Sequence, residues 1–279
     1  WETILNFFRY RAIPGVEYVS ESAYRRIVRT EGGAAEIEVR NADGHLEAAV
    51  RGIEPRHLFP LVQTLREVFD TDAPIADIAA VLRKDALLRR LLPLHPGIRV
   101  PGAFDRFEHI VRAILGQQVS VRAATTIAGR LALRYGDPAP ESLQVTGELT
   151  HLFPAPERLV RARMEALGIT KSRAATIRRV AGAVVARRLD LDPSVPSADF
   201  VAGFTSLRGI GPWTAEYTLL RAMKDPDAFP ASDLGVIKAM SPGNDVRLSA
   251  REIEARADAW RPWRAYAALL LWQRAAAGG

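Results

Sequence analysis

The sequence predicts an α+β protein, in which a small N-terminal antiparallel β-sheet domain with one helix is followed by an all-α body. Three observations predict this class. The first fifty residues show short runs typical of β-strands. From position 74 onward, apolar residues recur at helical spacing between Pro and Gly residues. A chain of 279 residues with 48% apolar content is also long enough to bury substantial cores.

The N-terminal domain is predicted from three short strands and a helix. The strand patterns cover residues 24–30, 34–41 and 45–52. Asp43-Gly44 separates the last two and is a hairpin signal, because both turn positions can adopt positive φ. Apolar residues at helical spacing then predict a helix over 55–69 that covers one face of the sheet.

The remaining chain predicts helices alone. Their ranges are 75–92, 105–118, 120–136, 155–168, 170–188, 197–207, 212–223, 232–240, 249–260 and 261–276. Ser120 is expected as an N-cap and Gly136 as the residue after a helix end.

Composition limits the function. The chain has 38 basic and 32 acidic residues and a net charge of +6, and nearly all basic residues are arginine. Because arginine suits phosphate, this favours an anionic polymer as partner, although an arginine-rich composition without such a role is the alternative. The absence of cysteine excludes disulfides and thiolate metal sites, and the five scattered histidines predict no catalytic metal. Without an 18-residue apolar run or a signal segment, we expect a soluble, intracellular protein.

The stretch "LRGIGPWTAEY" at 207–217 predicts a tight turn between two helices. Gly209 and Gly211 flank Ile210, and Pro212 is typical of the first position of a helix. Such a turn lets the backbone approach a phosphate, and the N–H groups of the new helix can bind an anion. A helix connection without a ligand is the alternative.

Two further features surround this turn. Trp213 and Tyr217 share one face of the new helix, which predicts either core packing or a wall for a flat base. Downstream, Asp233 or Ser232 is the expected N-cap of the helix "LGVIKAM". The N–H groups there favour a charged carboxylate, which is a poor general acid but can stabilise a cation.

Together "LRGIGPWTAEY" and "SDLGVIK" resemble the helix-hairpin-helix and the catalytic aspartate of the HhH-GPD DNA glycosylases, most closely the AlkA type (3-methyladenine DNA glycosylase II). "FDRFEHIVRAILGQQVSV", "ALGITKSRAATI" and "WRPWRAYAALLLW" follow the family's order, so the resemblance spans essentially the whole chain. It implies a sheet domain at 1–73 and an all-α helix-hairpin-helix glycosylase body. In that body, 74–104 plus 225–279 form the helical domain carrying Asp233, and 105–224 form the helical domain carrying the hairpin.

The resemblance implies a monofunctional glycosylase that excises alkylated purines, such as 3-methyladenine and 7-methylguanine, in base excision repair. Asp233 would stabilise the oxocarbenium-like sugar and help to position or activate water while the N-glycosidic bond is hydrolysed. Bifunctional relatives carry a lysine at the position of Trp213, where it forms a Schiff base. The tryptophan here therefore predicts no AP lyase activity.

Base flipping is also implied, because a base stacked in duplex cannot reach Asp233. The loop "GQQVS" corresponds to the family's wedge segment, with Gln117 and Gln118 as candidates; a plain helix-terminal loop is the alternative. The residues of the substrate pocket would be Trp213, Tyr217, Trp272 and Leu234. Leu234 stands where some relatives have an aromatic residue, and aromatic rings favour cationic bases.

The resemblance implies that the DNA backbone binds at the hairpin. It implies no cofactor other than a monovalent cation. The predicted DNA-binding residues are Gly209, Ile210, Gly211, Thr214, Gln117 and Gln118. The cation would be held by the main-chain carbonyls of Thr205, Leu207 and Ile210. Lys171 and Arg173 either contact phosphate or belong to a solvated helix face. Trp260 and Trp263 are predicted core residues, and Glu216 departs from the family pattern.

The expected partner is double-stranded DNA with alkylated bases, bound by a monomer in a bacterial cytoplasm, at the nucleoid, with no membrane contact. Two alternatives stay open: a non-catalytic helix-hairpin-helix DNA-binding protein, and a glycosylase for another lesion such as hypoxanthine. The chain begins with Trp1 rather than Met. We therefore expect either a trimmed chain or a piece of a longer polypeptide. In relatives an alkyl-transfer regulatory domain can be fused upstream.

Overall fold

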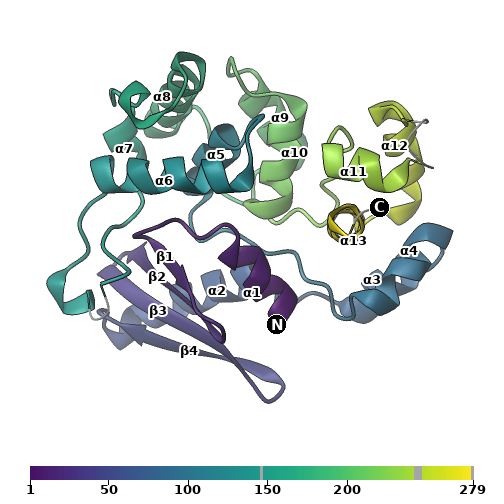
Figure 1. Ribbon diagram of the computed structural model, residues 1–279, viewed down its shortest axis with the longest axis horizontal. Coiled ribbons are helices and arrows are strands. Elements are labelled where there is room, and N and C mark those ends of the chain that lie inside the picture. Colours follow the sequence, from purple (N-terminus) through teal and green to yellow (C-terminus); the bar gives the residue numbers. More distant parts are fainter. Residues whose placement is uncertain (145–146, 242–246, 278–279) are drawn as a thin grey trace. The chain divides into compact units, whose positions relative to one another are not determined.

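The computed structural model describes residues 1–144, 147–241 and 247–277 (Figure 1). The strands are β1 Glu17–Val19, β2 Ala23–Thr30, β3 Gly33–Ala42 and β4 His45–Arg51. The helices are α1 Glu2–Arg9, α2 Leu58–Phe69, α3 Ile75–Leu82, α4 Ala86–Leu91, α5 Arg106–Leu115, α6 Val121–Tyr135, α7 Pro156–Leu159, α8 Lys171–Val185, α9 Ser197–Thr205, α10 Pro212–Arg221, α11 Leu234–Met240, α12 Ala250–Ala257 and α13 Arg264–Ala276. The predicted α+β class is therefore confirmed.

The strands form one antiparallel sheet in the order β1-β2-β3-β4, and Figure 1 shows them side by side in that order. Ala42 pairs with His45, so Asp43 and Gly44 form the predicted two-residue turn. Only Gly44 of these two has a positive φ, of +79°. The sequence prediction missed β1 and α1. Helix α1 packs against β1 and β2.

The chain divides into two compact units. The first unit comprises residues 1–65, 104–191 and 206–210, and the second comprises 66–103, 192–205 and 211–279. The three-domain division expected from the sequence stays a prediction.

A buried charge network joins the sheet to α5 within the first unit. Arg26 of β2 contacts Glu108 of α5 at 2.6 Å. Arg112 of α5 contacts both Glu108 and Glu17 at 3.0 Å, and Tyr24 donates a hydrogen bond of 2.6 Å to Glu17. Because removing one partner from such a network leaves a buried charge unpaired, these residues fix the sheet on the helix.

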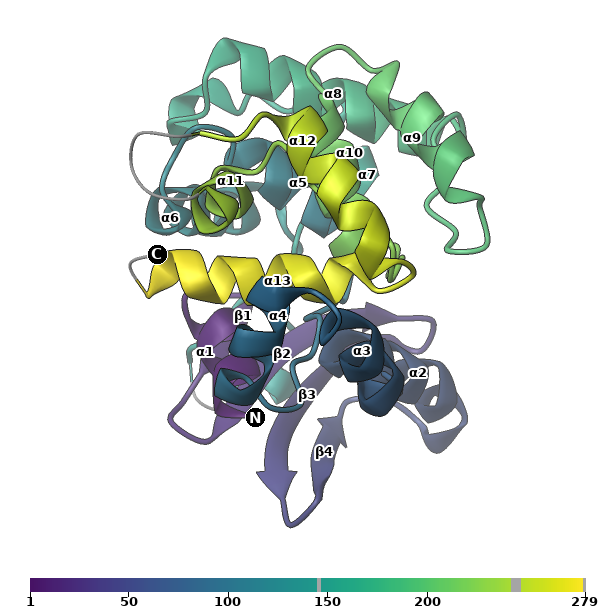
Figure 2. The same ribbon diagram turned by 90° about the vertical axis from the view of Figure 1, so that its right-hand side faces the viewer.

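The second unit is built around α13, whose residues from Ala265 to Leu271 are all buried. Helix α11 packs against α13, as Figure 2 shows, and α9 packs against α10. The positions of α11 and α10 determine where the predicted catalytic residue lies. Among the described residues, no helix is long and apolar enough to cross a membrane.

Two expectations about the extent of helices are corrected. The helix predicted over 75–92 is two helices, because the Asp85 side chain caps α4 by accepting from the N–H groups of Leu87 and Leu88. The helix predicted over 155–168 is only the four-residue α7, with a short 3-10 helix at Glu165–Leu167. Ser120 caps α6 as predicted.

Gly136 directly follows the last residue of α6, as predicted, and its φ is −72° rather than positive. Glycine is required there for another reason. A Cβ at Gly136 would lie 2.1 Å from the carbonyl oxygen of Leu152.

Candidate active site

Asp233 lies at the N-terminus of α11 and caps it. Its Oδ1 accepts hydrogen bonds from the main-chain N–H groups of Gly235, at 2.8 Å, and Val236, at 3.2 Å. The neighbouring Ser232 is exposed and is not the cap. The local sequence therefore fixes the Asp233 carboxylate against the start of a helix, where N–H dipoles point at it.

Two tryptophans from other helices complete the surroundings of Asp233. The indole Nε1 of Trp213, on α10, donates to Oδ2 at 2.8 Å. The indole Nε1 of Trp272, on α13, donates to Oδ1 at 2.8 Å. Backbone and indole N–H groups can only donate, so both oxygens of Asp233 act as acceptors. Among the described residues, no basic side chain forms an ion pair with this carboxylate.

The aromatic rings of the predicted pocket contact one another. Tyr217 stacks on Trp213, with ring centroids 5.3 Å apart and planes 8° apart. Its ring also meets Trp272 edge to face at 6.0 Å. Tyr217 therefore covers one face of Trp213. Leu234, the fourth predicted pocket residue, is 71% exposed.

Tyr217 is in turn held by a buried arginine. Arg221 donates from Nη1 to the Tyr217 hydroxyl at 3.1 Å. Its other nitrogens donate to the main-chain carbonyls of Pro101 and Gly102. The planar guanidinium is held by its hydrogen bonds to these two carbonyls, so its hydrogen bond to the Tyr217 hydroxyl restricts the orientation of the tyrosine ring.

Glu216 has a structural role that the sequence did not reveal. Its Oε2 accepts a hydrogen bond of 3.0 Å from the main-chain N–H of Phe229, which lies in the segment leading to Asp233. Burial raises the pKa of Glu216. Phe229 also packs edge to face on Trp260, which is fully buried as predicted. The signal in the sequence was an acidic residue three positions after Trp213, on the same helix.

The hairpin turn packs on α8 within the first unit. Gly209 has a φ of +100°, and a Cβ there would lie 2.1 Å from Oγ1 of Thr176. The Ile210 N–H closes the turn on the Leu207 carbonyl at 3.0 Å. Gly211, the N-cap of α10, has a φ of −100°, and a Cβ there would meet no atom of the described residues within 4 Å apart from its chain neighbours. Neither conformation nor packing within the chain therefore requires glycine at 211.

The two candidate wedge residues differ in their contacts. Gln117 donates from Nε2 to the Gly209 carbonyl at 3.3 Å, and its own carbonyl accepts from the Arg173 guanidinium. Gln118 is exposed and has a φ of +55°, which is uncommon for a residue other than glycine. Lys171 is also exposed. Thr214 has only 2% of its surface exposed, so its side chain is inside the fold.

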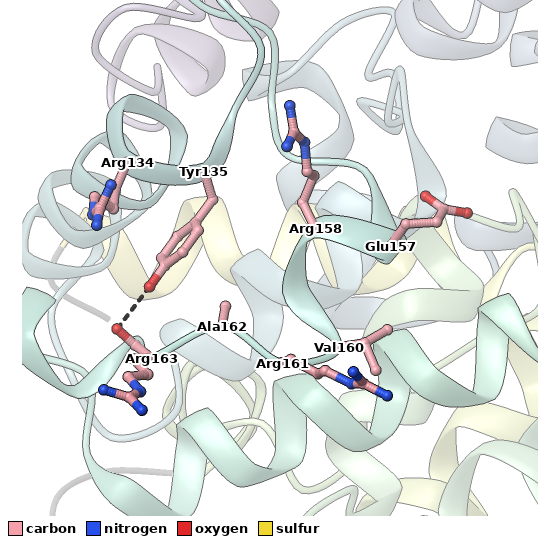
Figure 3. A pocket seen from close by; sticks show the side chains of 8 residues that line it. All are labelled: Arg134, Tyr135, Glu157, Arg158, Val160, Arg161, Ala162 and Arg163. Carbon is pink, nitrogen blue, oxygen red and sulfur yellow. Dashed lines mark hydrogen bonds between the residues drawn. The ribbon is translucent and has the colours of Figure 1, made fainter.

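An open cavity of about 450 Å³ with several arginines in its lining lies at the end of α6 and along α7, within the first unit (Figure 3). Its lining residues are Arg134, Tyr135, Glu157, Arg158, Val160, Arg161, Ala162 and Arg163. The Tyr135 hydroxyl donates to the Arg163 carbonyl at 2.7 Å. Figure 3 shows the arginine side chains pointing in different directions around the cavity rather than toward one point. None of the predicted site residues lines it.

In the described part of the chain, no group of three His, Cys, Asp or Glu side chains is placed to hold a metal ion. Of the main-chain carbonyls predicted for a monovalent cation, that of Leu207 accepts the Ile210 N–H and keeps one lone pair. The cation site at Thr205, Leu207 and Ile210 stays a prediction.

Comparisons with known proteins identify the family of the chain. Residues 1–105 match the AlkA N-terminal domain, and residues 111–265 match the HhH-GPD superfamily base excision DNA repair protein family. The chain is 32% identical to DNA-3-methyladenine glycosylase 2 of Escherichia coli, over 98% of this chain and 93% of the relative. It is 35% identical to the "Probable bifunctional transcriptional activator/DNA repair enzyme AlkA" of Mycobacterium tuberculosis, over 98% of this chain.

The chain spans 54% of the length of that Mycobacterium tuberculosis relative. Among solved structures, the fold is similar to that of a 3-methyladenine DNA-glycosylase from Archaeoglobus fulgidus, with a TM-score of 0.84. That match covers 99% of this chain and 94% of the other at 24% identity, so it supports the fold alone.

Proposed function

The chain belongs to the HhH-GPD superfamily of base excision DNA repair proteins, and from this membership we propose that it is a monofunctional DNA glycosylase for alkylated purines. Its substrate would be duplex DNA that carries bases of the 3-methyladenine or 7-methylguanine type. One observation carries the proposal. Asp233 is a carboxylate surrounded by neutral N–H donors, with no cation paired to it among the described residues.

The absence of a paired cation matters because of the charge that the reaction creates. When the bond from C1′ to the purine nitrogen breaks, the electron pair leaves with the base, and the positive charge of the alkylated base passes to the deoxyribose. A fixed carboxylate with no basic partner is able to stabilise this sugar cation. Water then adds to C1′, its proton passes to solvent, and an intact abasic strand remains.

The lesion would reach this site by base flipping. Gln118 is the better of the two candidate wedges, because it is exposed, whereas Gln117 is bonded to the hairpin turn. Gly211 supports the proposed phosphate contact, since the space beside it is open and the first N–H groups of α10 follow it. Ile210 and Gly209 would shape that turn. A main-chain role is all that the buried Thr214 could supply.

The proposal excludes AP lyase activity because the residue that meets Asp233 from the hairpin helix is an indole rather than an amine. Lys224 is the nearest lysine in sequence to α10, and its Nζ is engaged with Asp70 at 2.9 Å and with the Val100 carbonyl at 2.7 Å. Burial lowers the pKa of Lys224, but the contacts to Asp70 hold it in a structural role.

Base release from methylated DNA tests the function directly. The protein is incubated with duplex DNA treated with a methylating agent, and the free bases are identified by chromatography. We expect methylated purines, and no covalent adduct when borohydride is added to the reaction. Release of no base, with DNA still bound, would favour a non-catalytic DNA-binding protein. A borohydride-trapped adduct would contradict the monofunctional mechanism.

A further inference from the structure

The two oxygens of Asp233 are not equivalent. Oδ1 accepts three hydrogen bonds, from the N–H groups of Gly235, Val236 and the Trp272 indole. Oδ2 accepts one, from the Trp213 indole. A carboxylate has about four lone-pair sites on its two oxygens. Oδ1 is therefore saturated, and Oδ2 keeps free acceptor capacity.

Gly235 leaves space beside Oδ1 that the Trp272 indole occupies. A Cβ at Gly235 would lie 3.0 Å from Cδ1 of Trp272 and 3.1 Å from Oδ1 of Asp233. Both distances are shorter than ordinary van der Waals contact. The main chain of Gly235 has no positive φ to explain the glycine, since it lies in the first turn of α11. The glycine is instead explained by the close approach of the indole.

We propose that Gly235 and Trp272 are positioning residues for Asp233. The missing Cβ admits the Trp272 indole to Oδ1, the saturated Oδ1 fixes the rotation of the carboxylate, and Oδ2 becomes the oxygen presented to the deoxyribose. This inference rests on the proposed function for its catalytic consequence. The geometry of the carboxylate itself is independent of that function.

The consequence for Trp272 is a role beyond stacking on the substrate base. Its ring edge, which carries the N–H, is directed at Asp233. Tyr217 meets the same tryptophan edge to face at 6.0 Å, which restricts how the ring can turn away. A change that keeps the ring and removes the N–H should therefore affect the chemical step more than DNA affinity.

Gly235→Ala and Trp272→Phe test the inference, with Gly182→Ala as the matched control. Gly182 lies inside α8, where an added Cβ would meet no described atom within 4 Å beyond the backbone of its own helix and its chain neighbours. Single-turnover base release and the Kd for lesion-containing duplex are measured for each variant. We expect release about 10- to 100-fold slower for Gly235→Ala and Trp272→Phe, because small misplacements of a catalytic group have effects of this size. Their Kd values should stay within about twofold of wild type, which is a small change in binding free energy.

Indole N–H resonances in NMR spectra of ¹⁵N-labelled protein report the geometry without any reaction. Trp272→Phe assigns the Trp272 resonance by its loss. Gly235→Ala should move that resonance and leave the Trp213 resonance in place, whereas Asp233→Asn should move both. A duplex with a pyrrolidine abasic analogue, whose ring ammonium mimics the sugar cation, should move the Trp213 resonance more than that of Trp272.

The inference is overturned if Gly235→Ala behaves like Gly182→Ala in rate and leaves the Trp272 resonance unchanged. It is also overturned if the cationic analogue acts mainly on Trp272, since Oδ1 would then face the sugar. If the wild-type protein releases no base while Gly235→Ala still moves the Trp272 resonance, the positioning stands and the proposed function fails.

Discussion

Asp85 and Asp233 cap two helices of the same unit with the same local geometry, yet they differ in what else they contact. Each accepts from the N–H groups two and three positions later. Asp85 also forms an ion pair with Arg256, at 3.1 Å. Asp233 contacts two neutral indoles instead.

This comparison teaches what separates a structural aspartate from a candidate catalytic one. The charge of Asp85 is already neutralised by Arg256, so its contribution is to stability. Asp233 has N–H groups that hold its position without cancelling its charge, which leaves that charge for a cation that forms during a reaction. An N-cap motif alone therefore does not distinguish the two aspartates; the partners supplied by distant helices make Asp233 the candidate catalytic residue.

The largest expected effect is that of Asp233→Asn on base release. Asparagine is also a good N-cap, so the helix should persist while the negative charge is lost. We expect release to fall by at least about 100-fold, as when one group that stabilises a transition state is removed. DNA affinity should be nearly unchanged. Asp85→Asn is the control, with wild-type release; equal effects of the two substitutions would remove the distinction drawn here.

Asp85→Ala should affect stability and leave catalysis unchanged. The variant loses both the cap of α4 and the pair with Arg256. Removing an aspartate N-cap typically costs about 0.5–2 kcal/mol of the free energy of unfolding. Denaturant unfolding would measure this loss. A variant as stable as wild type would mean that solvent replaces these contacts at no cost.

The stabilisation from Asp85 should also depend on pH. Burial disfavours its charged form, but the N–H groups of Leu88 and Leu87 together with Arg256 outweigh this and lower the pKa of Asp85. A carboxyl whose pKa is lower in the folded state stabilises the fold above its unfolded pKa and loses that stabilisation as the pH falls. The difference in melting temperature between wild type and Asp85→Asn should therefore shrink below about pH 4. A constant difference down to pH 2.5 would contradict this.

Much of the candidate site could be predicted from the sequence, and the reasons for the rest are physical. Helical spacing and cap residues are local, so the N-cap role of Asp233 and the start of α10 at Pro212 could be predicted. The indole contacts could not, because Trp213 and Trp272 lie 20 and 39 positions from Asp233. Whether a ring offers its face or its N–H edge depends on tertiary packing.

The contacts of the wedge candidates and the break in the helix predicted over 75–92 also could not be predicted from the sequence. Gln117 and Gln118 are identical in type, and only the fold bonds one of them to the hairpin turn. The helical pattern of 75–92 continued through Asp85, where side-chain capping competed with helix propagation. By contrast, the strand patterns agreed with β2, β3 and β4 to within a residue or two, because each run of at least seven residues is bounded by turn residues.

The smallest expected effect is that of Glu216→Gln. Burial raises the pKa of Glu216 in the folded protein. Wild type should therefore lose stability as the pH rises from the pKa of the unfolded state through the higher pKa of the folded state. Glutamine keeps an acceptor for the Phe229 N–H and removes the charge. We expect the variant to equal or exceed wild-type stability at pH 7, because it removes a charge that burial disfavours and keeps the hydrogen bond. Thermal unfolding at pH 4 and pH 7 would measure it, and a loss at pH 7 would show that the charge itself is needed.

Substitutions at Gly209 and at Gly211 should have different effects on the amount of folded protein in a survey of natural or random variants. Any side chain at Gly209 collides with Thr176, so replacements there should lower the amount of folded protein in the cell. A replacement at Gly211 meets open space, so the protein should accumulate normally. Screens that count only surviving cells would merge the two positions. Screens that also measure protein abundance would separate a glycine that folding requires, as at Gly209, from one that only binding to a partner would require, as at Gly211.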